Sequence, residues 1–249
     1  MILVRFFLNL VVLIVEVGLV AGVAWVGWQF PVSFALATGL AGFMLGLRLE
    51  RARLSNELGF YFGGLARPLS WLTGSVALGE AAVKGLLAGV AALVTFSGTD
   101  PARLQWIAVV FAGCLFAGTS LLRWLRVRFA MRAERWGYFR LAPPLGLMFS
   151  AGVAGLVVLR LVPSPSLSDL TRKLFLDTPN RPTLAQASEL LFLFKQYFDE
   201  VIVSLLTTLV SRDWASVIGV VLSVNMLTGF VVAIYAVLIA ELIRWLERG

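Results

Sequence analysis

The sequence contains no histidine, and this absence removes a whole group of possible sites. Histidine is the usual general base of enzymes and the commonest metal ligand. There is one cysteine, Cys114, inside an apolar run, so no disulfide can form within the chain. We therefore expect neither a bound metal nor another cofactor.

The motifs of membrane-embedded enzymes are also missing. An intramembrane protease needs a nucleophile with its base, a metal motif or two aspartates within its spans. The sequence has no Gly-x-Ser-x-Gly motif, and no aspartate falls inside a predicted span. We predict that the protein is not an enzyme. The alternative that stays open is a lipid-modifying activity using acidic residues outside the spans, namely Asp199, Glu200 and Asp213.

What the sequence has in abundance is apolar residues. They make up 59% of its 249 residues, and the mean hydropathy is +0.90. Long apolar runs with these totals are typical of a polytopic membrane protein. The net charge of +7 comes from arginines that flank apolar helices, so it indicates topology and not nucleic-acid binding.

The apolar runs predict an all-α fold with about six transmembrane helices. We expect spans at 6–28, 31–47, 72–96, 105–122, 143–162 and from 214 to about 245. A further helix at 183–209 precedes the last span and either lies in the membrane interface or re-enters the membrane. Gly18 and Gly22, and Gly42 and Gly46, repeat a small-xxx-small spacing, which predicts that the first two spans form a close hairpin.

Three units follow from this division. Residues 1–122 form a four-helix bundle, 123–141 a basic linker, and 142–249 a two-span module that contains the segment 163–213. The linker carries six arginines against one glutamate, and by the positive-inside rule it is cytoplasmic. Both termini are then cytoplasmic in a cell (inner) membrane, and 163–213 lies outside. The arginines assigned to topology or to lipid headgroups are Arg123, Arg126, Arg128, Arg132, Arg135 and Arg140.

Three ionisable residues fall inside predicted spans, where charges are costly and often functional: Glu16, Glu80 and Lys84. Glu80 and Lys84 are four residues apart, so they share one helix face with the acid in the better order for an ion pair. They either neutralise each other or take part in ion passage.

The C-terminal third resembles the pore module of six-helix, tetrameric potassium channels. A predicted helix ends in Thr207 and Thr208, a short polar turn leads to Asp213, and 27 uncharged residues follow. In that family a pore helix ending in Thr-Thr precedes a Gly-Tyr-Gly-Asp filter and an inner helix. The glycines of the filter are replaced here by Val210, Ser211 and Arg212. The resemblance implies that these residues line a pore: Thr207, Thr208, Ser211, Arg212, Asp213, Asn225 and Thr228.

Simpler roles exist for the same residues. Thr207 and Thr208 could bond to backbone carbonyls at a helix end, and Asn225 could join two helices by a hydrogen bond. Two functional hypotheses therefore remain. The chain is either a subunit of a homo-oligomeric, channel-like pore or a non-catalytic membrane subunit or scaffold that assembles with other membrane proteins. The lipid bilayer is a partner in both.

Overall fold

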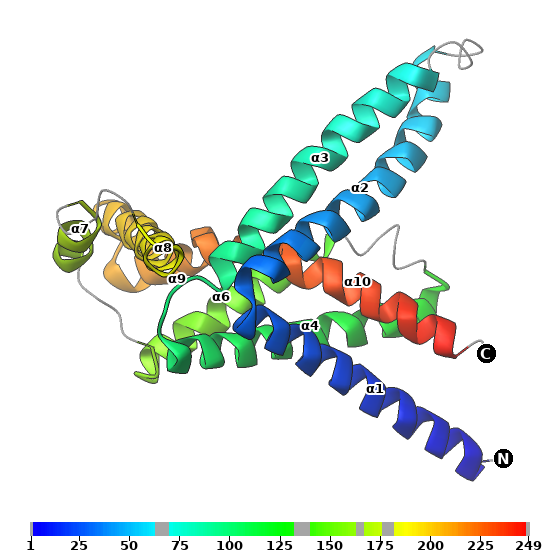
Figure 1. Ribbon diagram of the computed structural model, residues 1–249, viewed down its shortest axis with the longest axis horizontal. Coiled ribbons are helices and arrows are strands. Elements are labelled where there is room, and N and C mark those ends of the chain that lie inside the picture. Colours follow the sequence, from blue (N-terminus) through cyan, green and yellow to red (C-terminus); the bar gives the residue numbers. More distant parts are fainter. Residues whose placement is uncertain (1, 63–69, 132–139, 163–166, 176–181, 248–249) are drawn as a thin grey trace.

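The structure, a computed structural model, describes residues 2–62, 70–131, 140–162, 167–175 and 182–247. All regular structure in these ranges is helical, which confirms the all-α prediction (Figure 1). The elements are α1 Ile2–Gln29, α2 Pro31–Phe62, α3 Ser70–Thr95, α4 Pro101–Phe129, α6 Ala142–Val158, α7 Leu167–Phe175, α8 Leu184–Thr207, α9 Arg212–Leu222, the 3₁₀ helix η2 Val224–Leu227, and α10 Thr228–Leu246.

Five stretches within these ranges are long and apolar enough to cross a membrane. They are Asn9–Gln29, Pro31–Leu54, Gly74–Thr95, Pro101–Phe129 and Trp214–Leu246. The fifth expected span, at 143–162, corresponds to α6, an apolar helix of 17 residues that is shorter than these five. Helix α6 ends where Arg160 adopts a left-handed conformation, with φ of 59°. The chain is thus a polytopic membrane protein.

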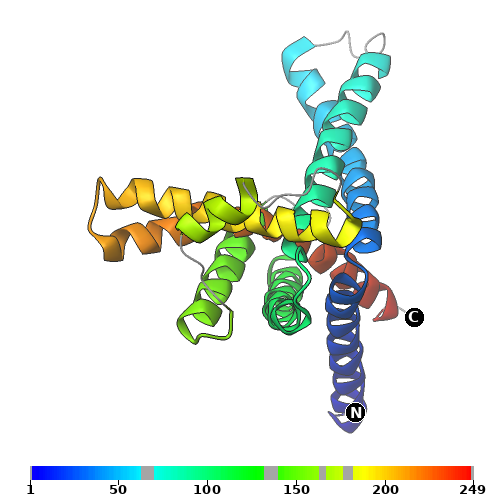
Figure 2. The same cartoon turned by 60° about the vertical axis from the view of Figure 1, so that its left-hand side comes forward.

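Helix α10 lies at the centre of the molecule. It contacts α6 and α4 most extensively and also touches α1, α2 and α3. Buried side chains lie on every face of its section from Val231 to Val237, whereas Leu238 and Leu242 further along are exposed. Figure 1 shows α1 beginning and α10 ending on the same side of the molecule, whereas α7, α8 and α9 lie on the other. After a 60° rotation, the α2–α3 hairpin projects away from α1 (Figure 2).

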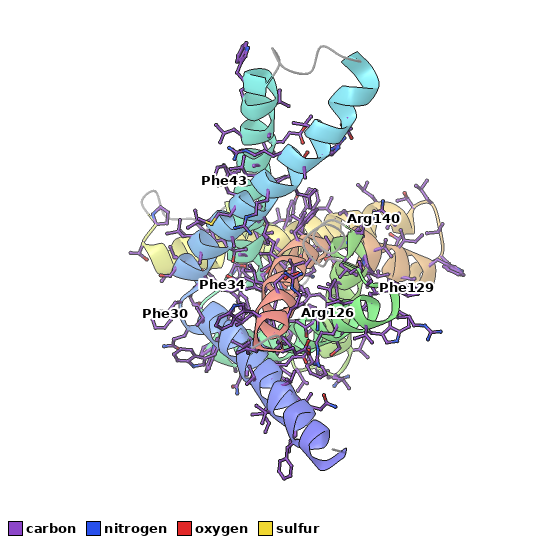
Figure 3. The ribbon with its side chains drawn as sticks, turned by 90° about the vertical axis from the view of Figure 1, so that its right-hand side faces the viewer. Phe30, Phe34, Phe43, Arg126, Phe129 and Arg140 are labelled. Carbon is purple, nitrogen blue, oxygen red and sulfur yellow. The ribbon has the colours of Figure 1, made fainter. Side chains whose placement is uncertain are left out.

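Aromatic side chains fill the middle of the bundle. Phe34 of α2 stacks on Tyr235 of α10, with ring centroids 5.1 Å apart, and contacts Phe96 and Phe111 edge-on. The Tyr235 hydroxyl is 3.0 Å from the hydroxyl of Thr38, so this buried polar group has a partner. Figure 3 shows Phe34 where α2 meets α10. The cluster joins helices that are distant in the sequence.

The close hairpin forms between α2 and α3, not between the first two spans as predicted. A Cβ atom on Gly85 would lie 2.8 Å from the carbonyl oxygen of Gly39, so the two backbones touch. Gly46 also faces α3, at Ala81. By contrast, a Cβ on Gly18 or Gly22 would meet no atom within 4 Å. The spacing rule identified close packing by Gly46 but could not identify which helix it packs against.

Two helices extend beyond their predicted ends, at 47 and 122. Helix α2 continues to Phe62 and α4 to Phe129, so residues assigned to basic loops are helical. On α2, Arg53 pairs with Glu57 at 2.7 Å, one turn away, and with Glu50 at 3.7 Å. Such pairs at spacings of three and four residues stabilise a helix in water, which explains why helix formation does not stop where the apolar run ends.

The last predicted span is broken. Helix α9 ends at Leu222, η2 makes a short turn, and α10 starts at Thr228. At the break, the backbone N–H of Asn225 donates to the hydroxyl of Ser223 at 3.1 Å. Serine side chains compete in this way for backbone groups that a continuous helix would use. The prediction of one continuous helix from 214 to 245 was therefore wrong, although the stretch is as apolar as expected.

Candidate functional site

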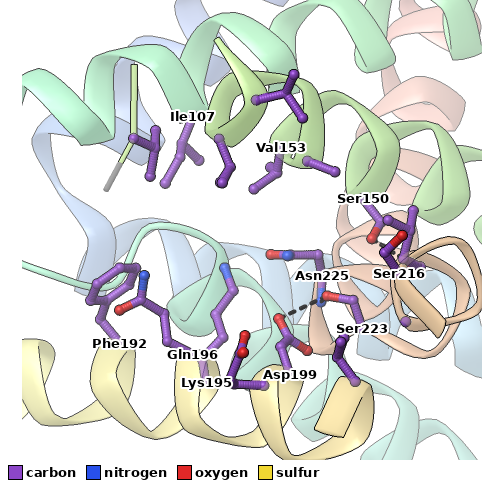
Figure 4. A pocket seen from close by; sticks show the side chains of 18 of the residues that line it. Ile107, Ser150, Val153, Phe192, Lys195, Gln196, Asp199, Ser216, Ser223 and Asn225 are labelled. Carbon is purple, nitrogen blue, oxygen red and sulfur yellow. Dashed lines mark hydrogen bonds between the residues drawn. The ribbon is translucent and has the colours of Figure 1, made fainter. Parts of the chain in front are cut away.

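A cavity of about 340 Å³ lies between α6 and the α8–α9 hairpin, with contributions from α4 and α7. Most of its wall is apolar and includes Ile107, Val153, Val157, Leu170, Phe192 and Val220. Polar side chains gather on the α8 side and around the break before α10 (Figure 4). Apolar cavities of 300–1,000 Å³ with a few convergent polar groups are the usual form of ligand sites.

Helix α8 is held at its start by the loop between α3 and α4. Thr183 and Gln186 form a capping box, in which glutamine takes the place of the glutamate that the sequence lacks at this position. The backbone N–H of Gly98 donates to Ser188 at 2.8 Å, and that of Thr99 donates to Glu189 at 2.9 Å. These bonds place the N-terminal half of α8 against the bundle.

A second attachment holds the middle of α8 against the break before α10. The carboxylate of Asp199 accepts the backbone N–H of Val224 at 2.7 Å and the hydroxyl of Ser223 at 2.8 Å. Burial raises the pKa of Asp199, and these two hydrogen bonds oppose that rise. Both carboxylate oxygens are therefore engaged by the turn, and Asp199 forms part of the cavity wall.

Lys195 lies one turn before Asp199 and projects into the cavity (Figure 4). Its side chain is buried, with 5% of the residue exposed. Burial lowers the pKa of Lys195 to about 8, the nearby carboxylate of Asp199 raises it, and Arg103 lowers it further. No hydrogen bond or ion pair joins its ammonium to any other part of the described chain. This cation thus faces an apolar space without a direct partner.

The amide of Asn225 also faces this cavity. The residue is 7% exposed, and its side-chain oxygen Oδ1 has no hydrogen-bond partner within the described ranges. A buried polar atom without a partner costs free energy. Asn225 was predicted as a pore residue or as a link between helices. Within the described chain it lies on the wall of the cavity, and its predicted role in a pore stays a prediction.

The cavity reaches the surface near the end of α6. Val158 lines it and is 81% exposed, and its neighbours Leu159 and Leu161 are also exposed. Helix α8 presents further exposed apolar side chains, among them Phe194 and Phe198. The mouth therefore opens beside a surface suited to contact with lipid tails or the membrane interface.

The other predicted pore residues are distributed over several environments. The hydroxyls of Thr207 and Thr208 donate to the carbonyls of Ser204 and Leu205, at 2.6 and 2.7 Å, as expected for helix-terminal threonines. Thr228 is buried and bonds to Thr95 at 2.7 Å. Ser211 precedes α9 and is exposed. Arg212 and Asp213 form the first turn of α9, and their side chains lie outside the described part.

The intramembrane charges have partners that the sequence did not reveal. Glu16 is fully buried and accepts hydrogen bonds from Thr119, at 2.7 Å, and from Arg123. Lys84 lies 3.4 Å from Glu80, as predicted, but forms its closer contact with Glu50 of α2. Glu50 is almost completely buried, whereas the side chain of Glu80 is 42% exposed. The pairs Lys84–Glu50 and Arg123–Glu16 thus join separate helices.

The basic linker begins within α4. Arg126 pairs with Glu247 just after α10, and Arg123 lies 3.6 Å from the same carboxylate. Figure 3 shows Arg126 beside α10. Arg128 near the end of α4 and Arg140 just before α6 are exposed. Arg132 and Arg135 lie outside the described residues.

Sequence analysis missed Lys195 and considered Asp199 only as a surface acid. One signal was available, because these two charges are four residues apart in a run that is otherwise rich in phenylalanine, leucine and valine. Comparison of the chain with protein-family models, with curated proteins and with solved structures found no match.

Proposed function

We propose that the protein is an integral membrane binding protein that takes up a small amphiphilic molecule in the cavity between α6 and the α8–α9 hairpin. One observation carries this proposal: two buried polar groups, the ammonium of Lys195 and Oδ1 of Asn225, face an apolar cavity without hydrogen-bond partners in the described chain. The polar head of an amphiphilic ligand would form hydrogen bonds with these two groups, and its apolar body would fill the rest of the cavity.

The position of the mouth supports uptake from the membrane. Val158 and Leu159 expose 81% and 69% of their surface at the end of α6. An amphiphile in the bilayer would keep its chain in apolar surroundings as it enters. We further propose that this end of the bundle is the outer one and that both termini are cytoplasmic, because the last turn of α4, with Arg126 and Arg128, lies on the side of the termini.

The test uses binding of radiolabelled dodecanol to protein in phosphatidylcholine nanodiscs, with empty nanodiscs as background. We expect saturable binding at one site per chain. Ala154→Trp places a large side chain in the cavity wall and should abolish this binding. Val109→Trp, at a position on α4 that is 56% exposed, is the matched control and should bind normally. Equal binding by both variants would exclude the cavity as the site.

The channel hypothesis remains a separate proposal, a homo-oligomeric pore subunit. It requires Asn225 and Thr228 to face a symmetry axis, and within one chain both are buried. It also requires an inner helix with a face open to that axis, and α10 exposes Leu238 and Leu242 although it contacts several other helices. Ion conductance of the purified protein in planar bilayers tests this hypothesis. A scaffold role is compatible with ligand binding, and co-purification of other membrane subunits would support it.

A further inference from the structure

We infer that the head of the bound amphiphile is anionic and that Lys195 holds it. This inference rests on the proposed function and specifies the chemistry of the same site: a molecule with one apolar chain and a carboxylate or phosphate head. The geometry supports it, because the cation comes from α8 and projects into a cavity whose opposite wall is formed by apolar side chains of α4 and α6, including Ile107 and Val153 (Figure 4).

An unpaired ammonium in an apolar cavity is unfavourable, and an anion is the partner that offsets this cost best. Asp199 is the nearest acid on the same helix, but its oxygens accept bonds from Ser223 and from the backbone of Val224. Asp199 therefore stabilises the turn and leaves the ammonium of Lys195 without a direct contact. A ligand carboxylate or phosphate could make that contact.

The other charged residues near Lys195 have opposite effects on the binding of an anion. Arg103 of α4 lies near enough to affect Lys195 electrostatically and adds a second positive charge, which favours an anion. The guanidinium of Arg103 lies over the ring of Phe192, 3.3 Å from its centroid, at the apolar wall of the cavity. Glu200 also lines the cavity and opposes an anion. Because the ammonium of Lys195 projects into the cavity, we infer that its effect outweighs that of Glu200 and that the ligand head is negatively charged. Substitution of Glu200 tests this balance.

Asn225 completes the recognition of the head. An amide carries both donors and an acceptor, and rotation about its last side-chain bond exchanges them. Its NH₂ group can donate to an anion beside Lys195, or its Oδ1 can accept from a hydroxyl on the same head. Because the amide of Asn225 can either donate or accept, it suits a phosphate monoester and a carboxylate equally well. The class of ligand is therefore defined by the negative charge of its head and not by the shape of the head.

The experiment compares three radiolabelled probes with the same twelve-carbon chain in phosphatidylcholine nanodiscs at pH 7: dodecanoate, dodecanol and dodecyltrimethylammonium. We expect dodecanoate to bind at least about tenfold more tightly than dodecanol, as a charge-assisted hydrogen bond to Lys195 predicts. Lys195→Gln and Lys195→Met should lower the affinity for dodecanoate at least about tenfold, so that the preference over dodecanol disappears. Dodecyl phosphate in place of dodecanoate distinguishes the two kinds of anionic head.

Glu200→Gln is the reciprocal variant. It removes a negative charge from the cavity wall, so it should raise the affinity for dodecanoate and lower any affinity for dodecyltrimethylammonium. Tighter binding of dodecyltrimethylammonium than of dodecanoate by the unaltered protein would overturn the inference. Equal binding of dodecanoate and dodecanol, unchanged by Lys195→Gln, would overturn the inference and leave the proposed function intact. If no probe binds, the proposed function itself fails.

Discussion

Asp199 accepts a hydrogen bond from the backbone N–H of Val224 at 2.7 Å, and in this way α8 caps the turn that leads into α10. We predict that Asp199→Ala destabilises the protein by about 1–3 kcal/mol, because a buried N–H and the hydroxyl of Ser223 lose their acceptor. Thermal unfolding in detergent measures the effect. Glu200→Ala, which changes a neighbouring acid without these bonds, is the control and should have a smaller effect.

The stability of the protein should depend on the protonation of Lys195. Its pKa in the folded protein is about 8, below the ordinary value of 10.5, so the unfolded chain binds more protons between these two values. Stability should therefore rise with pH from about 8 to 10.5. Lys195→Met should stabilise the protein at pH 7 by roughly 3 kcal/mol and remove this dependence.

Unfolding of both proteins between pH 7 and 10.5 checks this prediction. The advantage of the variant should shrink as the pH rises. Lys173→Met, an exposed lysine of α7, is the control and should leave the pH profile of the wild type unchanged. A constant difference between wild type and Lys195→Met across this range would contradict a lowered pKa for Lys195.

The two acids that contact Lys84 should not be equivalent. Glu50→Gln removes an almost completely buried partner and should cost about 3 kcal/mol, since a charge left alone inside a protein is unfavourable. Glu80→Gln removes a partly exposed one at 3.4 Å and should cost less than about 1 kcal/mol. Thermal unfolding of both variants decides the order, and the reverse order would show that Glu80 is the main partner.

The proposed orientation in the membrane can be tested by labelling. Cysteines introduced at Ala130, after α4, and at Ser168, on α7, are exposed positions in a background of Cys114→Ser. A membrane-impermeant maleimide applied to intact cells should label the cysteine at 168. It should label the cysteine at 130 only after the cells are permeabilised. Labelling of both positions from outside would require a different arrangement of spans.

The apolar pattern predicted the helical fold and the approximate positions of the long apolar helices, but not the short helix α7, because burial in lipid depends on composition over about 20 residues. It did not predict where α2 and α4 end, because the polar extensions form ion pairs: Arg53 pairs with Glu57 within α2, and Arg126 of α4 pairs with the distant Glu247. Nor did it predict the break before α10, which depends in part on Asp199 from a different helix. The partner of Glu16, an arginine 107 residues away, could not be inferred from spacing at all.

The central position of α10 has a consequence for biosynthesis. The ribosome makes this helix after all the helices that surround it, and at about 5–20 residues per second the stretch between α4 and α10 takes roughly 5–20 s to translate. During that time the earlier helices are already in the bilayer, and Thr38 and Thr95 still lack their partners on α10. The close contact between α2 and α3 does not involve α10 and can form during this time, whereas the centre of the bundle is completed only when α10 inserts.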